Sequence, residues 1–270
     1  MSSLDLTQLS PEDQVGLAAT LNKLLRGVKD ALGPNLVGVY LVGSYALGAG
    51  DSHSDVDFAV VTHAPVSPAS LSLLEKLHET LPALSTFGAD HLEGSYLPAG
   101  DLRGASGAGW LYVDNGSRMI ERSSHDNTLA FRWVLRNRGI PLVGPEPTSL
   151  LEEVDDSALR EEARARAVSW RGLLASHPET VGDSWAQTYF VTGLCRLLYT
   201  YETGAITSKL EATMWAAERL DPAWTGLLER AVADRATTWQ RVGRPAEPAL
   251  AAETVRLGAE IARLMESRES

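Results

Sequence analysis

The sequence of 270 residues is poor in cysteine, with Cys195 as its only one. A single cysteine excludes an internal disulfide and a zinc site built on cysteines, and it fits a reducing compartment. Long hydrophobic runs are also missing: nowhere do about 18 apolar residues follow one another, so we expect no membrane-spanning helix. Residues 1–5 carry no basic group and no apolar run, so we expect no signal peptide and a cytoplasmic protein.

Positively charged residues are also few. Its 24 Lys and Arg residues stand against 35 Asp and Glu residues, which gives a formal net charge of −11. This charge disfavours non-specific attraction to nucleic acid or anionic lipid, so we expect neither as a partner. It is compatible with a small cationic ligand. Only four of the basic residues are lysines, and one of them, Lys209, lies in the second half of the chain.

Hydrophobic residues are present in the proportion that a globular fold needs. They make up 44% of the chain, charged residues make up 22%, and the length suffices for one large domain or two modest ones. Strand patterns come first, and only helix patterns follow after about residue 150. We therefore expect an α+β protein with two domains. Residues 1–150 would form a mixed β-sheet flanked by helices, and residues 151–270 would form an all-α bundle.

Apolar periodicity and helix start and stop signals give the expected elements. The expected strands are 36–42, 56–62, 92–97, 110–113, 118–122 and 141–144. The strands 110–113 and 118–122 would form a hairpin with a tight turn at Asn115-Gly116. The expected helices are 11–32, 68–81, 126–138, 157–175, 183–203, 208–220, 222–241 and 249–267. The polar, glycine-rich stretch 43–55 is expected to be a loop.

The most informative motif joins the first two expected strands. Gly43-Ser44 follows the first strand, and Asp55-Val56-Asp57 opens the second. Because alternate side chains of a strand share a face, Asp55 and Asp57 point the same way. Two carboxylates so close together repel unless a cation lies between them, and Mg²⁺ prefers such oxygen ligands. Gly43 would let the backbone approach a ligand, and Ser44 would offer its hydroxyl and N–H to phosphate oxygens.

A third carboxylate, Glu93, lies in the apolar strand pattern 92–97, where an isolated charge is costly. Together with Asp55, Asp57 and the glycine-serine turn, it predicts a site for a complex of metal and nucleotide. Plainer interpretations exist. An Asp-x-Asp at a strand start is often a solvated edge or a turn cap, and Glu93 could instead be the partner of an arginine. The combination of all these features favours the site over coincidence.

Two segments resemble a known family. VYLVGSYALGAGDSHSDVDFAVV, residues 39–61, resembles the active-site signature of the polymerase-β-type nucleotidyltransferases. TGLCRLLYTYETGAITSKLEATMWAAERL, residues 192–220, resembles the helical domain of the aminoglycoside adenylyltransferases that act on streptomycin and spectinomycin. The resemblance extends from about Val37 to Leu228. It implies a nucleotidyltransferase domain in residues 1–150 and a helical domain that binds substrate and nucleotide in residues 151–270.

The resemblance also implies roles for residues of the first domain. Asp55 and Asp57 would hold Mg²⁺, and Ser44 and Ser54 would touch the triphosphate of ATP. Glu93 would be the general base that takes the proton from the attacking hydroxyl of the acceptor. Such chemistry is consistent, because metal ions neutralise charge on a triphosphate and a positioned base makes an alcohol a better nucleophile.

Three further residues would contact the nucleotide by the same resemblance. Arg196 and Lys209 match basic residues that reach the phosphates, and Ser208 before Lys209 predicts a capped helix start that itself favours anions. Asn127, or Asp126 beside it, falls where the family has an aspartate that contacts the nucleotide. Arg196 could instead form an ordinary ion pair on a helix surface, and Asn127 could be a plain helix cap.

The acceptor-binding positions match the family less well. Ala186 and Tyr189 stand where the family has an acid and a histidine, and Asp183, one helical turn earlier, is the nearest acid. Trp185 and Trp110 are candidates for a tryptophan that stacks on the substrate. We take Asp183 and Trp185 as the substrate-binding residues. The other acids that could meet a cationic acceptor are Asp114, Glu121 and Glu202, and Asp234 stands at a family tyrosine that contacts ATP.

We therefore expect a monomeric enzyme that uses ATP and Mg²⁺ to adenylylate a hydroxyl of an aminoglycoside or aminocyclitol antibiotic and releases pyrophosphate. Two alternatives stay open. One is a nucleotidyltransferase that acts on another small molecule, a protein or a tRNA. The other is a non-catalytic nucleotide-binding protein of the same fold, which would not need a base at Glu93.

Overall fold

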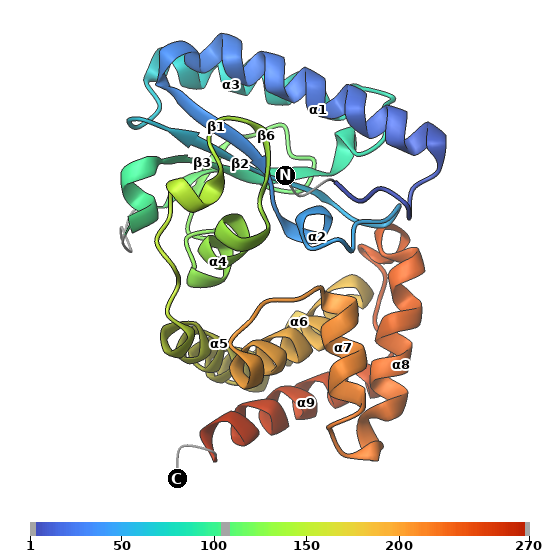
Figure 1. The fold of residues 1–270 in the computed structure, drawn as a ribbon. Helices are drawn as coiled ribbons and strands as arrows, with labels where there is room; N and C mark the ends of the chain where they lie inside the picture. Colours follow the sequence, from blue (N-terminus) through green and yellow to red (C-terminus); the bar gives the residue numbers. More distant parts are fainter. Residues whose placement is uncertain (1–3, 104–108, 268–270) are drawn as a thin grey trace. The chain divides into compact units, whose positions relative to one another are not determined.

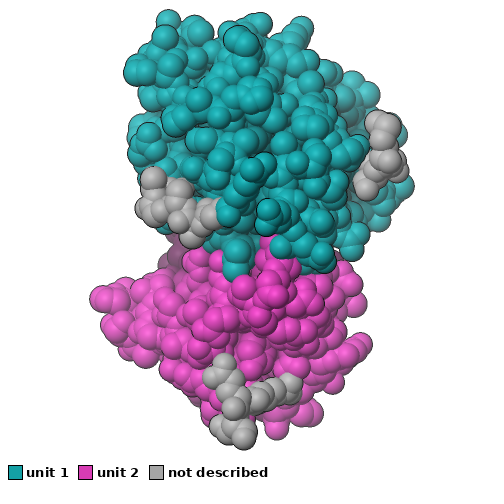
Figure 2. All heavy atoms as spheres, turned by 60° about the vertical axis from the view of Figure 1, so that its left-hand side comes forward, with its two compact units in different colours: residues 1–153 teal, residues 154–270 magenta. Residues whose placement is uncertain are grey.

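The computed structural model describes residues 4–103 and 109–267. The chain divides into two compact units, unit 1 with Met1–Glu153 and unit 2 with Val154–Ser270 (Figure 2). Unit 1 contains a six-stranded sheet with helices, and unit 2 is helical (Figure 1). The expected fold class, a mixed sheet flanked by helices and followed by a helical region, is confirmed. Among the described residues, no helix combines the length and the apolar character that crossing a membrane requires.

The sheet of unit 1 has the strand order β5-β4-β3-β2-β1-β6. The strands are β1 (Leu36–Leu41), β2 (Val56–Thr62), β3 (Leu92–Pro98), β4 (Trp110–Val113), β5 (Glu121–Ser123) and β6 (Ile140–Val143). β2 and β3 run parallel, and the other neighbouring pairs run antiparallel. Parallel neighbours need a crossover connection, which the helix between β2 and β3 supplies.

Helices α1 (Pro11–Leu32) and α3 (Pro68–Thr80) cover one face of this sheet (Figure 1). Their leucines, such as Leu24, are buried together with Phe58 of β2. Because side chains alternate along β2, Phe58 faces this core while Asp57 faces the opposite side. A register slip by one residue would turn acids into the core, so the apolar face fixes where the acids lie.

The opposite side of the sheet carries α2 (Gly43–Ala46) and α4 (Leu129–Arg138) (Figure 1). We expected a loop where α2 lies, and the short helix begins at Gly43 with a φ of 59°. We also expected α4 to start at residue 126, which is wrong. Thr128 is the cap of α4, because its side chain accepts a hydrogen bond from the N–H of Phe131.

The expected hairpin has the right partners but a different turn. β4 pairs with β5 in a register that places Tyr112 opposite Glu121, so residues 114–120 make a longer connection than a tight Asn-Gly turn. Gly116 has a φ of 65°, and its N–H donates to the carbonyl oxygen of Leu92 at 2.9 Å. The glycine therefore ties the connection to β3 and does not close a two-residue turn.

Unit 2 is built around α6 (Ser184–Thr203). The helices that pack against it are α5 (Asp156–Ser176), α7 (Lys209–Ala217), α8 (Thr225–Asp234) and α9 (Pro248–Glu266). Leu194 of α6 and Leu257 and Ile261 of α9 are fully buried in this core. The helices expected at 157–175, 183–203, 208–220 and 249–267 are confirmed.

The helix expected over 222–241 is broken, with 3₁₀ turns at Pro222–Trp224 (η7), Arg235–Thr237 (η8) and Trp239–Arg241 (η9) on either side of α8. The break after α8 has a cause in Asp234, which is only 5% exposed. Its carboxylate pairs with Arg230 Nε at 2.8 Å and with Arg241 Nη2 at 2.6 Å. The hydroxyl of Thr237 donates to the carbonyl oxygen of Asp234 at 3.2 Å and competes with regular helical bonding.

His78 of α3 is a titratable group inside the core of unit 1. It is 1% exposed, its Nε2 lies 2.7 Å from the hydroxyl oxygen of Tyr96, and its ring stacks on Phe58. Burial lowers the pKa of His78 to about 4, because the charged imidazolium would lose its hydration. The folded protein therefore holds this histidine neutral at pH values where the unfolded chain binds a proton.

The free energy of unfolding should fall as the pH drops from 6.5 to about 4. Because the unfolded His78 binds a proton in this window and the folded one does not, its contribution is complete above pH 6.5 and is lost toward pH 4. We expect the wild type to lose about 3 kcal/mol more over this window than His78→Gln, which does not titrate. Urea unfolding near pH 7 and near pH 4 measures this difference. Equal losses in the two proteins would contradict the prediction.

Candidate functional site

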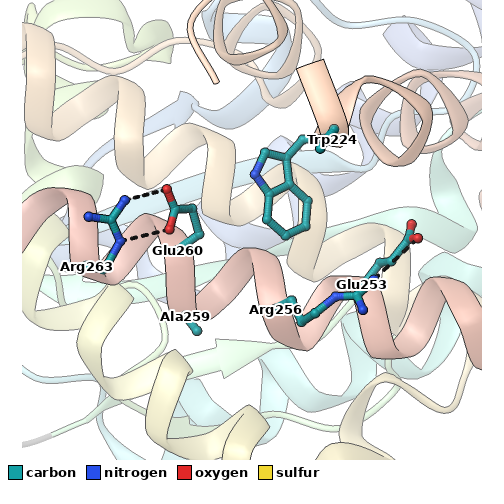
Figure 3. Close-up of a pocket in the computed structure, with 7 residues that line it drawn as sticks. Trp224, Glu253, Arg256, Ala259, Glu260 and Arg263 are labelled. Carbon is teal, nitrogen blue, oxygen red and sulfur yellow. Dashed lines mark hydrogen bonds and ion pairs between the residues drawn. The ribbon is translucent and has the colours of Figure 1, made fainter. Parts of the chain in front are cut away.

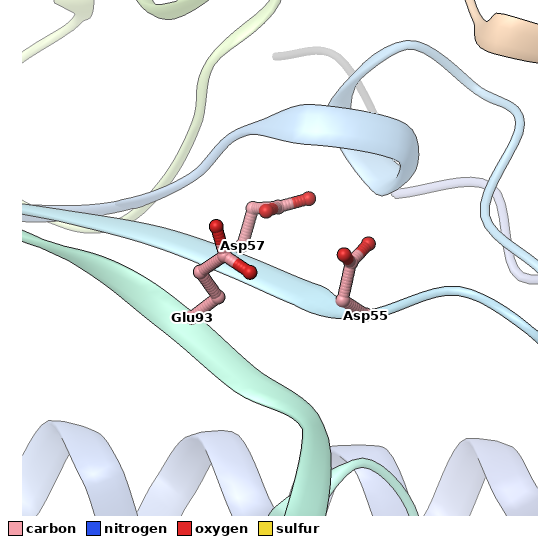
Figure 4. A group of neighbouring side chains, drawn as sticks. All are labelled: Asp55, Asp57 and Glu93. Atoms are coloured by element: carbon pink, nitrogen blue, oxygen red, sulfur yellow. The ribbon is translucent and has the colours of Figure 1, made fainter. Parts of the chain in front are cut away.

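Three carboxylates gather where β2 and β3 begin (Figure 4). Asp55 directly precedes β2, Asp57 is the second residue of β2, and Glu93 is the second residue of β3. Asp57 and Glu93 are register partners across the parallel pair. One carboxylate oxygen of each residue lies within 4.8 Å of those of the other two, and all three side chains are half-buried. We call these residues the acidic cluster.

Position 43 requires a glycine because the side chain of Asp57 lies against it. A Cβ at this position would lie 1.8 Å from Asp57 Oδ2, and the φ of 59° disfavours any other residue. The N–H of Val42 donates to the carbonyl oxygen of Asp57 at 3.0 Å, so β1 and β2 hold the turn close to the acid. A glycine here allows the backbone to pass directly over the carboxylate.

The two serines that the sequence singled out differ in their surroundings. The Oγ of Ser44 is buried and has no hydrogen-bond partner within residues 4–103 and 109–267. A buried hydroxyl without a partner is costly, so a ligand oxygen at this place would be favourable. Ser54 instead donates to Asp51 Oδ1 at 3.0 Å and accepts from the N–H of Asp51 at 3.1 Å. Its hydroxyl stabilises the loop before β2.

Glu93 is held by residues of the neighbouring strand and loop. Tyr112 of β4 donates a hydrogen bond to Glu93 Oε1 at 2.6 Å, and His125 Nε2 lies 3.6 Å from the same oxygen. Burial raises the pKa of Glu93 to about 7, the negative charge of Asp55 adds to this, and the bond from Tyr112 opposes it. No arginine pairs with Glu93 in the part of the chain that the structure describes. A carboxyl that titrates near neutrality suits proton transfer.

Asp126 and Asn127 lie side by side in the chain but have different contacts. Asp126 Oδ2 accepts from the hydroxyl of Ser95 at 2.8 Å, and the charge of Asp126 also raises the pKa of Glu93. Burial raises the pKa of Asp126 itself. Asn127 Oδ1 instead accepts from Arg132 Nη2 at 2.7 Å. The interpretation of Asn127 as a plain cap of α4 is wrong, and Asp126 is the residue whose charge reaches the acidic cluster.

In unit 2, the two basic residues expected at the phosphates lie on α6 and α7. Ser208 caps α7 by accepting from the N–H of Glu211 at 3.1 Å, so the capped helix start is confirmed, and Lys209 is the first helical residue. Lys209 Nζ lies 4.7 Å from the centre of the Tyr189 ring. Arg196 is half-buried in α6 and forms no ion pair with any described residue, so the surface ion pair is not seen.

The two expected substrate residues stand at the start of α6. Asp183 is the cap of this helix, because its Oδ1 accepts from the N–H groups of Trp185 at 2.9 Å and Ala186 at 3.1 Å. Trp185 stacks on Tyr189 with ring centres 5.3 Å apart and planes 17° from parallel. Trp185, Tyr189 and Lys209 thus form one aromatic and cationic group within unit 2.

A pocket of about 490 Å³ also opens in unit 2, between η7 and α9 (Figure 3). Its lining residues are Ala223, Trp224, Glu253, Arg256, Ala259, Glu260 and Arg263. The charged groups pair with one another: Arg263 Nη2 lies 2.6 Å from Glu260 Oε1, and Arg256 Nη2 lies 3.5 Å from Glu253 Oε1. None of the residues singled out in the sequence lines this pocket.

No pattern in the sequence indicates Tyr112, His125 or Ser95 as parts of the site. Tyr112 reaches Glu93 only because β4 pairs with β3 in a register that places Tyr112 opposite Ser95. Alternation within the expected strand 110–113 shows that Tyr112 shares a face with Trp110, but not which strand lies beside it. The strand order is a tertiary property, and it is what brings the tyrosine to the acid.

The arrangement supports chemistry on a phosphate that carries a metal ion. Closely spaced carboxylate oxygens are typical ligands of hard divalent cations such as Mg²⁺. The buried hydroxyl of Ser44 follows the glycine turn that passes over Asp57. Glu93, with a pKa near 7, adds a group that can accept a proton. A protein that only binds a metal–nucleotide complex would need the closely spaced carboxylates and the Ser44 hydroxyl. It would not need a group that accepts a proton.

Two protein-family models match the sequence. Residues 21–86 match the family described as a nucleotidyltransferase domain, and residues 149–254 match the aminoglycoside adenylyltransferase, C-terminal domain. The first range contains both aspartates of the acidic cluster. The second contains Arg196 and Lys209.

The individual proteins that this chain resembles are also adenylyltransferases. A spectinomycin 9-adenylyltransferase of Staphylococcus aureus (strain N315) is 29% identical over 220 residues, which are 76% of this chain and 80% of the relative. An aminoglycoside (3'') (9) adenylyltransferase of Klebsiella pneumoniae is 25% identical over 222 residues, 76% of this chain and 79% of the relative. The crystal structure of spectinomycin adenyltransferase AAD(9) from Enterococcus faecialis with ATP and spectinomycin has a similar fold. Its TM-score is 0.69 at 17% identity, covering 91% of this chain and 99% of that one. With both domain matches in this order, the chain is an aminoglycoside adenylyltransferase-like nucleotidyltransferase.

Proposed function

We propose that this enzyme transfers the adenylyl group of ATP to a hydroxyl of an aminoglycoside or aminocyclitol and releases pyrophosphate. The observation that carries the proposal is the acidic cluster, in which Asp55, Asp57 and Glu93 lie within 4.8 Å of one another. The names of the relatives support the acceptor class, since the S. aureus protein is a spectinomycin 9-adenylyltransferase. The AAD(9) structure, which contains ATP and spectinomycin, supports ATP as the donor.

Asp55 and Asp57 would hold a divalent cation, and Mg²⁺ is the ion that the donor set favours. Asp55 and Asp57 are two residues apart, so their side chains point the same way. Their carboxylate oxygens are hard donors, which Mg²⁺ prefers. The three acids of the cluster also repel one another at this spacing unless a positive charge is present. When bound, the ion neutralises charge on the triphosphate and on the pyrophosphate that leaves.

The triphosphate would be met by the Gly43-Ser44 turn of unit 1 and by two basic residues of unit 2. Ser44 offers a buried hydroxyl without a hydrogen bond from a described residue, and Gly43 lets the chain turn directly against the Asp57 carboxylate. Arg196 and Lys209 would add positive charge, with Lys209 at the start of α7, where backbone N–H groups also favour anions. Ser54 and Asn127 rank behind these residues, because their side chains already bond to Asp51 and Arg132.

Glu93 would take the proton of the acceptor hydroxyl. The freed oxygen forms a bond to the α-phosphorus of ATP, and the bond from that phosphorus to the bridging oxygen breaks. Pyrophosphate leaves with the electron pair of the broken bond, and the proton stays on Glu93 until solvent removes it. A base whose pKa lies near the working pH is effective in such a step.

The acceptor would bind partly through Asp183 and Trp185. A polycationic antibiotic needs negative charge nearby, and Asp183 Oδ2 accepts no hydrogen bond from a residue within the described ranges. Trp185, stacked on Tyr189, offers a flat apolar surface for a sugar or cyclitol ring. The net charge of −11 favours the approach of a cation over long range.

The proposed reaction can be followed by pyrophosphate release from ATP with Mg²⁺ and either spectinomycin or streptomycin. We expect release that depends on the antibiotic and that falls by about 10²- to 10⁴-fold in Glu93→Gln, while the affinity for ATP stays the same. Glu75→Gln, which alters an exposed acid of α3, is the matched control and should keep full activity. Absence of release with every aminoglycoside, together with ATP binding, would favour a binding protein. Unchanged turnover in Glu93→Gln would show that Glu93 is not the base.

Binding of the cation can be measured without turnover. Mn²⁺, which is paramagnetic and takes the same ligands as Mg²⁺, should bind to the wild type in the presence of a non-hydrolysable ATP analogue. In Asp57→Asn we expect the affinity to fall by about tenfold or more, because one of the two anionic ligands is lost. Asp30→Asn, a change at an exposed acid of α1, should leave binding unchanged. Equal Mn²⁺ affinity in all three proteins would remove Asp57 from the metal site.

A further inference from the structure

The two oxygens of the Glu93 carboxylate are in different situations. Oε1 accepts the hydrogen bond from Tyr112 at 2.6 Å and lies 3.6 Å from His125 Nε2. Oε2 accepts no hydrogen bond from any residue in the ranges that the structure describes. One oxygen is therefore anchored and the other is left for a ligand. The anchor comes from a residue that the proposed chemistry itself does not use.

Tyr112 reaches Glu93 diagonally across two strands. Register places Tyr112 of β4 opposite Ser95 of β3, and Glu93 lies two residues before Ser95 on the same face. Diagonal neighbours of this kind are within reach of a long aromatic side chain. Tyr112 is 4% exposed, so its hydroxyl has little access to water.

The hydroxyl of Tyr112 can donate only one hydrogen bond, and the distances to its two neighbouring carboxylates show that Glu93 accepts it. Glu93 Oε1 lies at 2.6 Å, whereas Asp114 Oδ1 lies at 3.4 Å, which is long for a hydrogen bond. Burial, and the charge of Glu93 after it, raise the pKa of Tyr112 far above its ordinary value, so it keeps this proton at neutral pH. Tyr112 is a donor to Glu93 and does not exchange protons with it.

His125 supports the tyrosine from the side. Its ring stacks on that of Tyr112 with centres 5.2 Å apart and planes 25° from parallel. The stack restricts the rotation of the Tyr112 ring, and the half-exposed imidazole places its Nε2 3.6 Å from the same Glu93 oxygen that Tyr112 donates to. A hydrogen bond that is buried, short and flanked by a ring can hold a carboxylate in one orientation.

We propose that Tyr112 is a positioning residue for the general base: it anchors Glu93 Oε1 so that Oε2 takes the proton of the acceptor hydroxyl. This inference rests on the proposed function of Glu93. In the step itself the proton moves from the hydroxyl to Oε2, the hydroxyl oxygen bonds to the α-phosphorus, and pyrophosphate leaves with the electrons of the broken bond. Tyr112 keeps its own proton throughout. Orientation of this kind affects the rate of transfer and not the binding of ATP.

Tyr112→Phe removes the hydroxyl and keeps the ring. We expect kcat for antibiotic-dependent pyrophosphate release to fall about 10- to 100-fold, which is the effect of losing one hydrogen bond to a charged group, with KM for ATP unchanged. Tyr96→Phe is the matched control. It removes another buried tyrosine hydroxyl, bonded at 2.7 Å to His78 on the opposite face of the sheet, and should leave kcat unchanged.

A double-mutant cycle separates positioning from a general effect on structure. If Tyr112 acts through Glu93, adding Tyr112→Phe to Glu93→Gln should leave the residual rate unchanged. An equal loss in both backgrounds, a higher KM for ATP without a lower kcat, or a fully active Tyr112→Phe would overturn the proposal. Unchanged turnover in Glu93→Gln would overturn the proposed base as well, so the two failures can be told apart.

A crystal structure of Tyr112→Phe gives a readout that needs no acceptor. We expect the Glu93 side chain to occupy more than one rotamer there, and a single rotamer in Tyr96→Phe. A Glu93 side chain that keeps the wild-type rotamer at full occupancy in Tyr112→Phe would contradict the positioning role whatever the enzyme's acceptor is.

Discussion

Repulsion among three carboxylates is the constraint on which the rest of this site depends. Asp55, Asp57 and Glu93 lie within 4.8 Å of one another on one face of two parallel strands, where burial makes their charge more costly than in water. The strands cannot relieve the repulsion by slipping, because their other face is packed under α1 and α3 with residues such as Phe58. The fold therefore keeps a destabilising arrangement in place, as is common where a protein binds a cation or reacts.

Several neighbouring features make sense as responses to this constraint. Gly43 lets the chain turn against the Asp57 carboxylate, where a Cβ would collide at 1.8 Å. Tyr112 donates to Glu93, and the hydroxyl of Ser95 donates to Asp126, whose charge adds to the same field. These hydrogen bonds partly stabilise the negative charge of the carboxylates but do not neutralise it. The acidic cluster therefore keeps negative charge that a divalent cation, bound together with a nucleotide, would neutralise.

Local patterns predicted most of the secondary structure, and contacts between distant segments account for the differences. Apolar periodicity with the Ser10 cap was sufficient for α1, and the Asp-x-Asp motif was sufficient to place two acids on one face. The helix expected over 222–241 breaks because Asp234 pairs with arginines on both sides of the break, which no local signal contains. Tyr112 was missed for the same reason, since its role follows from the order of strands. Glu93 was predictable from its apolar strand pattern and the family resemblance, whereas Tyr112, which acts only through the pairing of β4 with β3, was not.

We propose that Asp55 and Asp57 bind a cation while Glu93 takes the proton of the acceptor. The most direct measurement is a crystal structure of the enzyme with Mn²⁺ and a non-hydrolysable ATP analogue, with the ion located by its anomalous scattering. We expect an ion at about 2.2 Å from carboxylate oxygens of both aspartates, with the α-phosphate of the analogue facing Glu93 Oε2. An ion or a nucleotide bound away from the acidic cluster, with both aspartates free of metal, would contradict it.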